Sequence, residues 1–416
     1  MVKLPLYTEQ KYRLAGCLII CTMLLLLEIK TNFQCHGDAG GDNRYCYFPM
    51  AASLIDGNPN TTYNTSYLHG RGIVLPLVYA VIWKITHPFK QFQIEKDIIQ
   101  LYTIIRILAP LSVILALFIL LFLVLKIRNT VTFLLALIFY LEIDPFYEML
   151  NNGYLDTLYF LFIAIALYLI VQLSRTFKSK YSIILGIIWF VLPMLRANGL
   201  FIIIHTLVFL VGLGILHYRD QEYFKQWKRL FLILIGTFVL VNVAYEVYIY
   251  IINWQPNPNV VKHFPIYPGA LSSISKNPAT IMPEIRSWAD LWTLLIQYLT
   301  LFPKLINQAS LFTTPSQKAH CIATWLHVHT NPWRYWQIQL LLFIAHLNLL
   351  RYQLKEKNKN IIMVYLAAAI NFFIQIMAGY NARYYVFVYF AIFFPIIWTA
   401  DHYLIQPIYK NITGSS

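Results

Sequence analysis

The sequence has few charged residues. Asp, Glu, Lys and Arg make up 12% of its 416 residues, whereas hydrophobic residues make up 59%. Soluble globular domains carry about 25% charged residues, so this chain has too little charge to cover a soluble surface. It also lacks the alternation of apolar and polar residues that a transmembrane β-barrel requires. We therefore expect an all-α protein in lipid, because backbone groups in hydrocarbon are satisfied within helices.

Acidic residues and cysteines are scarce as well. There are 18 acidic residues against 32 basic ones, which gives a net charge of +14. Lys and Arg lie mainly in short segments between apolar runs, a pattern that indicates membrane topology rather than a nucleic-acid partner. The five cysteines show no spacing typical of metal ligands. For Cys35 and Cys46, in one predicted outer loop, we expect either a disulfide or two free thiols.

Apolar runs long enough to cross a bilayer recur along the chain. They predict about ten transmembrane helices in a single membrane domain, residues 1–416. The first run follows basic residues and has no small-residue cleavage site, so we expect it to be retained as a span. The predicted spans are residues 14–31, 101–125, 130–149, 157–174, 182–195, 199–216, 230–252, 335–350, 361–379 and 384–404.

The basic segments between these spans give the predicted topology. With the N-terminus in the cytoplasm, every strongly basic short loop is cytoplasmic, and so is the C-terminus. Two apolar segments, 73–86 and 291–302, are too short to cross, and we expect them to be interfacial helices on the outer side. They belong to two large outer loops, residues 32–100 and 253–334. The basic residues of the predicted cytoplasmic loops are Lys126, Arg128, Arg175, Lys178, Lys180, Arg219, Lys225, Lys228, Arg229, Arg351, Lys355, Lys357 and Lys359.

Two sequons for N-glycosylation, which begin at Asn60 and Asn64, lie in the first predicted outer loop. They would be glycosylated in the lumen of the endoplasmic reticulum and have no such meaning in a bacterium. The sequence therefore predicts a multi-pass protein of either the bacterial inner membrane or the endoplasmic reticulum membrane.

Carboxylates lie next to predicted spans on the outer side. Asp38 and Asp42 belong to a glycine-rich stretch just after the first span. A carboxylate at a membrane face can act as a general base toward a hydroxyl that lies within hydrogen-bond reach. The alternative is a solvated turn stabilised by side-chain to backbone hydrogen bonds. Asp156 opens the span at 157–174, where it either serves a site or stabilises the helix N-terminus.

Basic side chains are also predicted on the outer side, where membrane topology favours few of them. Arg196 and Arg383 lie in outer turns that are too short for ordinary solvated loop residues. Arg is suited to bidentate contact with phosphate, so both are candidates for a phosphate site. The alternative is that each anchors its helix by reaching to the interface. Further outer candidates are His69, Arg71 and His263.

Motifs along the chain occur in the order typical of a known enzyme family. The first group is Gly41-Asp42, then Tyr45 or Tyr47, Ala51-Ala52 and Asp56-Gly57. The later motifs are His69-Gly70-Arg71 before an interfacial helix, Arg106 near the start of a span, the stretch from Pro145 to Asp156, Leu195-Arg196-Ala197-Asn198-Gly199-Leu200, and Ala382-Arg383-Tyr384. In this order the chain resembles the GT-C superfamily of membrane glycosyltransferases, which includes the protein O-mannosyltransferases and the lipid A aminoarabinose transferases.

The resemblance implies a GT-C-like fold and an inverting transfer reaction. A sugar would leave a polyprenyl phosphate donor, undecaprenyl or dolichyl, and join a lipid, glycan or protein acceptor on the outer face. Asp42 would activate the acceptor as the base, with Asp38 as the alternative, and Asp156 would orient the acceptor or the sugar. The residues implied for substrate and lipid-phosphate binding are Arg196, Arg383, His263, His69, Arg71, Tyr45 and Asn198.

A lipid-linked donor requires no metal ion, and we expect no cofactor. The chain has no Asp-x-Asp pair of the kind that binds a nucleotide-sugar through a metal. Glu142 and Asp144 have a Glu-x-Asp spacing, which is the place where a divalent ion would fit if one were bound.

Two other classes of function also fit the sequence. A transporter or flippase for a lipid-linked sugar would carry buried acids and outer basic residues too. Against it stand the absence of an inverted repeat and the length of the first outer loop. The third class is a non-enzymatic assembly subunit, in which the outer acids have no chemical role. Ionisable residues gathered at the outer face favour an enzyme, and ionisable residues at mid-membrane favour a transporter.

Overall fold

The structure is a computed structural model, and every regular element in its described part is a helix. There is no β-strand within the described residues, which confirms the all-α prediction for that part of the chain. The described residues are 47–55, 74–88, 90, 94–127, 129–141, 146, 154–196, 199–216, 218–251, 335–356, 358–378 and 386–408.

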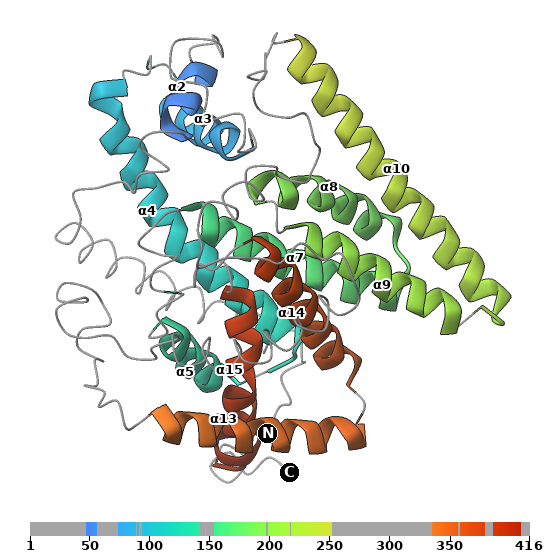
Figure 1. The fold of residues 1–416 in the computed structure, drawn as a ribbon. Helices are drawn as coiled ribbons and strands as arrows, with labels where there is room; N and C mark the ends of the chain where they lie inside the picture. The colour runs from blue at the N-terminus through green and yellow to red at the C-terminus, as the bar shows by residue number, and fades with distance from the viewer. Residues whose placement is uncertain are drawn as a thin grey trace, which may run out of the picture.

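The helices follow one another along the chain with short connections from α7 to α10 (Figure 1). Their bounds are α2 Phe48–Ile55, α3 Val74–Thr86, α4 Ile94–Phe118, η3 Ile119–Val124, α5 Thr130–Leu141, α7 Tyr154–Thr176, α8 Ser179–Leu195, α9 Leu200–Leu216, α10 Gln221–Ile251, α13 Tyr335–Glu356, α14 Lys359–Ala378, α15 Val386–Ala400 and η9 Asp401–Ile405.

A helix occupies each predicted span that falls within the described residues. The boundaries differ most at α4 and α10, which begin at Ile94 and Gln221, well before the apolar runs predicted from 101 and 230. Both helices have charged and polar residues in their first turns, and these residues lie outside the apolar runs. The first predicted span, 14–31, and the segment 291–302 lie outside the described residues.

Three helical segments are long and apolar enough to cross a membrane. They are Asp156–Thr176, Gln221–Val247 and Val386–Ile408. A segment of about 20 apolar residues matches the hydrocarbon thickness of a bilayer, so these segments indicate a membrane protein.

Helix α7 lies at the centre of the helices described here (Figure 1). It packs against α4, η3, α8 and α9. Small and apolar side chains such as Ala164, Ala166 and Leu167 are fully buried on it. Small residues let neighbouring helices approach closely, which is a common way to pack helices in a membrane.

Helix α10 lies at the periphery, as Figure 1 shows. In the most apolar 18-residue stretch of α10, only 11% of the residues are buried. The share is 67% in the corresponding stretch of α7. Leu232, Leu240 and Val243 are exposed on it, and a stripe of exposed apolar side chains on a long helix suits contact with lipid. Its other face meets α8 at Gly186, where an added Cβ would lie 2.9 Å from the Leu234 carbonyl oxygen.

Helices α2 and α3 pack against each other, and they also touch α4 and α8. α3 occupies the segment predicted to be an interfacial helix, residues 73–86. Tyr79 and Trp83 are fully buried on it, so one face of α3 is held by protein. Its position relative to a membrane stays a prediction.

Two helices continue into π-helical segments, α4 into η3 and α15 into η9. The carbonyl of Val124, the last residue of η3, accepts a hydrogen bond from Asn360 Nδ2 at 2.6 Å. In η9 the buried Asp401 accepts hydrogen bonds from Thr132 of α5 and, at 2.6 Å, from Gln406 Nε2. Buried polar groups require such partners, so both π-helical segments are held by side-chain hydrogen bonds.

Four helix ends converge on one cavity: the ends of α7 and α9 and the starts of α10 and α14. Arg175 at the end of α7 donates a hydrogen bond to Asn360 Oδ1 at 3.2 Å. The connections α7–α8, α9–α10 and α13–α14 therefore meet in one region, which we name the basic end. It carries Arg175, Lys178, Arg219, Lys225 and Lys359.

Candidate functional site

A buried ion pair joins the start of α7 to the end of α8. The carboxylate of Asp156, in the first turn of α7, contacts the guanidinium of Arg196, the residue that follows α8. The side chains are 5% and 14% exposed, respectively. At about 1.5 Å per residue, Asp156 lies about 28 Å along α7 from Arg175 at the basic end. The pair therefore marks the opposite end of α7.

The chain turns sharply after α8, and this turn places Arg196. The N–H of Arg196 donates to the Leu192 carbonyl at 3.0 Å, and the N–H of Gly199 donates to the Arg196 carbonyl at 2.8 Å. A Cβ on Gly199 would lie only 2.5 Å from the Leu192 oxygen. Only glycine fits this close approach of two backbone segments, so the Arg-x-x-Gly spacing has a direct structural cause.

Aromatic side chains fill the space next to this end of α7. Phe160 lies one turn after Asp156 on the same side of the helix, and it packs edge-on against Phe146. Tyr140 stacks on Phe390 and donates a hydrogen bond to the Phe390 carbonyl at 2.8 Å. Apolar surroundings lower the local dielectric constant, so charges in such a region interact more strongly than in water.

The chemistry of the pair follows from its geometry. A guanidinium carries five N–H donors, and one carboxylate accepts at most two of them in a bidentate contact. The planar guanidinium of Arg is also the group whose geometry matches a phosphate. Asp156, held in place by Arg196 and by its helix, is suited to orient a hydroxyl group.

Asp156 and Arg196 are the two predicted site residues that the described part of the chain contains, and the structure brings them together. Their roles in catalysis stay predictions. Predicted residues that lie outside the described part are Asp38, Asp42, Tyr45, His69, Arg71, Asn198, His263 and Arg383, along with Glu142, Asp144, the cysteines Cys35 and Cys46, the sequons at Asn60 and Asn64, and the loop 253–334.

The small pair Ala51-Ala52 and the aromatic Tyr47, quoted above for the family resemblance, fall in and next to α2. All three are buried. α2 packs on α3, and the small side chains of the pair suit this close packing. This part of the motif therefore packs α2 against α3 within the first predicted outer loop. The same predicted loop contains Asp42.

Sequence reasoning missed two buried polar residues inside helices, His205 of α9 and Asn371 of α14. Both side chains are fully buried. Neither ring nitrogen of His205 makes a hydrogen bond of ordinary geometry within the described residues, and the backbone of Met363 lies near the ring. Their residue types were visible in the sequence, but nothing in the pattern of apolar residues shows which face of a helix is buried.

Sequence reasoning also missed the cavity at the basic end, whose volume is about 470 Å³. Its polar lining comes from Ser174, Arg175, Tyr223, Asn358, Lys359 and Asn360. In the sequence, Arg175 and Lys359 belong to short basic segments between apolar runs, a pattern that indicates membrane topology and no ligand site. A pocket of this size suits a small ligand.

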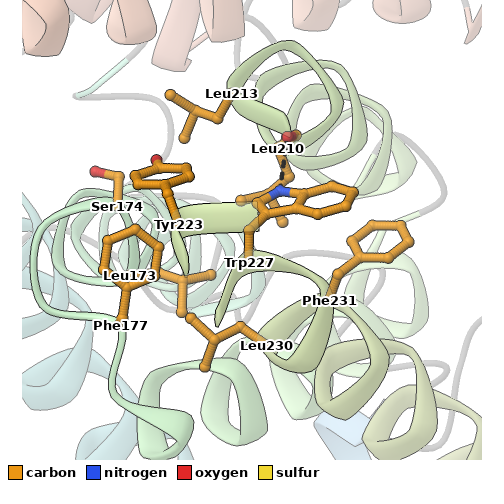
Figure 2. A pocket seen from close by; sticks show the side chains of 9 residues that line it. All are labelled: Leu173, Ser174, Phe177, Leu210, Leu213, Tyr223, Trp227, Leu230 and Phe231. Atoms are coloured by element: carbon orange, nitrogen blue, oxygen red, sulfur yellow. Dashed lines mark hydrogen bonds between the residues drawn. The ribbon is translucent and has the colours of Figure 1, made fainter. Parts of the chain in front are cut away.

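One wall of this cavity is a closely packed apolar cluster (Figure 2). Ser174, Leu213 and Tyr223 belong to both. Trp227 fills the centre of the cluster and donates a hydrogen bond to the Leu210 carbonyl at 2.9 Å. The free space left in the cluster is about 10 Å³, about enough for one water molecule. The cluster is therefore a solid wall and the space for a ligand lies beside it.

Within the described residues, no group of three or more His, Cys, Asp or Glu side chains is placed to hold a metal ion. The Glu-x-Asp spacing at Glu142 and Asp144 lies outside this part of the chain.

No protein-family model matches the chain, and no curated protein matches it.

Proposed function

We propose that the chain is an integral-membrane glycosyltransferase of the GT-C type. An acceptor hydroxyl oxygen attacks the anomeric carbon of a polyprenyl-phosphate-linked sugar, and the bond from that carbon to the phosphate oxygen breaks. The polyprenyl phosphate leaves with the electron pair of the broken bond, and the hydroxyl proton passes to Asp42. The sugar is transferred with inversion, because attack and departure occur on opposite faces of the anomeric carbon.

The observation that carries the proposal is the buried contact between Asp156 and Arg196. The two residues come from separate motifs of the family resemblance, the stretch Pro145 to Asp156 and the stretch Leu195 to Leu200. Charged residues at the depth of membrane helices are costly unless they are paired or used. An acid and an arginine at one helix end supply a group that orients a hydroxyl and a group that neutralises a departing phosphate.

The proposal includes about ten spans, with the basic end in the cytoplasm. Lys and Arg gather there, as the positive-inside rule requires of short cytoplasmic loops. The distance of about 28 Å along α7 from Arg175 to Asp156 is close to the hydrocarbon thickness of a bilayer. Asp156 and Arg196 would then lie at the outer face, where a flipped lipid-linked sugar is presented.

Within this site, Asp42 is the base and Asp156 orients the acceptor or sugar, with Asp38 as the alternative base. Arg196, Arg383 and His263 neutralise the lipid phosphate as its charge increases in the transition state. His69, Arg71, Tyr45 and Asn198 complete the binding site for donor and acceptor. The resemblance implies these roles, and the contact between Asp156 and Arg196 supports them for those two residues.

The test compares cells with the intact gene, without it, and with the Asp42→Asn variant. Mass spectrometry of lipid-linked sugars and of total glycans is the readout. The proposal expects a polyprenyl-phosphate sugar to accumulate and one glycosylated product to disappear, both in the deletion and in the variant. Identical profiles with and without the gene would overturn it.

A transporter or flippase of a lipid-linked sugar is the second candidate, and His205 and Asn371 favour it. Polar side chains buried within helices mark the paths of many transporters. The two functions differ in their products, since a flippase moves the lipid-linked sugar intact and a transferase cleaves it. Proteoliposomes with a fluorescent lipid-linked sugar separate them: translocation without release of polyprenyl phosphate favours the flippase.

A further inference from the structure

We propose that the cavity at the basic end binds the phosphate headgroup of an anionic lipid. This inference does not depend on the transfer reaction, because it concerns the end of α7 that is remote from Asp156. It rests on the lining of the cavity, on its charge balance and on the helix faces around its mouth.

The cavity has two positive side chains and no negative one among its described lining residues. Arg175 and Lys359 supply the charge, and both side chains are exposed. Within the described part of the chain neither forms an ion pair, and Arg175 instead donates to the neutral amide of Asn360 at 3.2 Å. Two cations in a pocket whose described lining has no carboxylate attract an anion, and the acid Asp220 lies beside this lining, where it accepts the Tyr223 N–H at 3.1 Å.

The polar groups around the two cations suit a phosphate. α14 begins at the cavity, where the Asn358 side chain accepts the Asn360 N–H at 3.0 Å. The positive end of the helix dipole therefore adds to the field of Arg175 and Lys359. The hydroxyl groups of Ser174 and Tyr223 also line the cavity, and the Ser174 hydroxyl donates to the Val171 carbonyl at 2.9 Å. Guanidinium and ammonium groups are the usual donors to phosphate oxygens.

The surroundings of the cavity favour a lipid over a free anion. Val208 and Ile215 of α9 and Ile362 of α14 are exposed apolar side chains on the two helices that flank it. These helix faces would contact acyl chains when the headgroup is in the cavity. Basic pockets between membrane helices on the side of short basic loops are typical sites for anionic headgroups.

The volume of about 470 Å³ is within the usual range for a small ligand, about 300–1,000 Å³. It accommodates a headgroup and excludes a whole lipid, whose chains must therefore lie outside. The packed cluster around Trp227 borders the cavity on the α10 side, where the two share Ser174, Leu213 and Tyr223. The open route for the chains is consequently along α9 and α14.

The test uses the full chain in detergent and native mass spectrometry with phosphatidylglycerol. The site variant is Arg175→Gln with Lys359→Gln. The control variant is Lys180→Gln with Lys355→Gln, which removes the same charge from exposed residues that do not line the cavity. We expect the site variant to bind phosphatidylglycerol about 10- to 30-fold more weakly, and the control to bind like the unaltered protein.

Two further probes separate the sources of the phosphate. Phosphatidylcholine, whose headgroup is neutral overall, should bind much more weakly than phosphatidylglycerol. Inorganic phosphate at millimolar concentration should displace little of the bound phosphatidylglycerol, because it lacks acyl chains. Complete displacement by inorganic phosphate would overturn the lipid assignment.

The single variant Lys359→Gln tests whether weaker binding could come from a folding defect. The Lys359 side chain is exposed and makes no ion pair within the described residues, so its replacement should leave the fold intact. We expect it to weaken phosphatidylglycerol binding about 5-fold at an unchanged melting temperature. An equal loss in the site and control variants, or full binding by both site variants, would refute the proposal.

Discussion

Asp156 at the start of α7 and Arg196 after the end of α8 form a buried ion pair, although they lie in separate parts of the sequence. The short α7–α8 connection at the basic end makes the two helices an antiparallel pair, and the ion pair ties their other ends. The same contact therefore holds two helices together and places an acid and an arginine side by side.

The ion pair predicts a marked loss of stability when one partner is removed. Arg196→Gln removes the guanidinium from the buried Asp156 carboxylate, and breaking a buried ion pair in this way typically costs about 3–5 kcal/mol. Thermal unfolding in detergent should show a lower melting temperature for Arg196→Gln and for Asp156→Asn. The double variant should lose less than the sum of the two single variants, because no charge is then left unpaired. Strict additivity would show that the two side chains do not interact.

The turn after α8 predicts that Gly199→Ala destabilises the protein, because its Cβ would collide with the Leu192 carbonyl group. We expect a lower melting temperature and a weaker contact at Arg196. Gly212→Ala is the matched control, since an added Cβ there meets no atom within 4 Å. Because alanine favours a helix more than glycine does, Gly212→Ala should be neutral or slightly stabilising. Equal effects of the two variants would contradict the steric argument.

Helix positions were predictable from the sequence because each long apolar run has to form a helix in lipid. Helix starts were not, since α4 and α10 begin with polar residues that extend beyond the apolar runs. The π-helical segments also escaped prediction. Their hydrogen bonds come from distant side chains such as Asn360, whose contact with Val124 spans 236 residues of sequence.

The residues of the candidate site that belong to a sequence motif were predictable. Residues that come together only through helix packing were not. Asp156 and Arg196 were singled out because acids and arginines near span ends need an explanation. The cavity at the basic end was not predicted, because Arg175 and Asn360 are separated by 185 residues. Their meeting depends on how α7 and α14 pack, which composition and spacing do not specify.

The proposed topology predicts opposite labelling of two engineered cysteines. In a variant without the native cysteines, Ser66→Cys should react with an impermeant reagent from outside, and Lys225→Cys only after the membrane is permeabilised. Residue 66 belongs to the first predicted outer loop, and Lys225 lies in the first turns of α10 at the basic end. Gathering the basic loops on the cytoplasmic side is the physical reason for this arrangement. Reaction of both cysteines from the same side would rule it out.

The assignment of the base predicts that Asp42→Asn lowers the rate of sugar transfer roughly 100-fold or more. Asn keeps the size of Asp and much of its hydrogen bonding but cannot accept a proton, so binding of the lipid-linked donor should remain. Transfer is measured in membrane vesicles with a labelled polyprenyl-phosphate sugar, and donor binding is measured separately on the purified protein.

Asp38→Asn is the matched control, because Asp38 lies in the same glycine-rich stretch but outside the spacing of acid, aromatic, small pair and glycine that selected Asp42. It should retain most of the activity. An inactive Asp38→Asn with an active Asp42→Asn would move the role of base to Asp38. Full activity of both variants would remove this stretch from the catalytic site, since a general base that contributes to the rate cannot be replaced by an amide without loss.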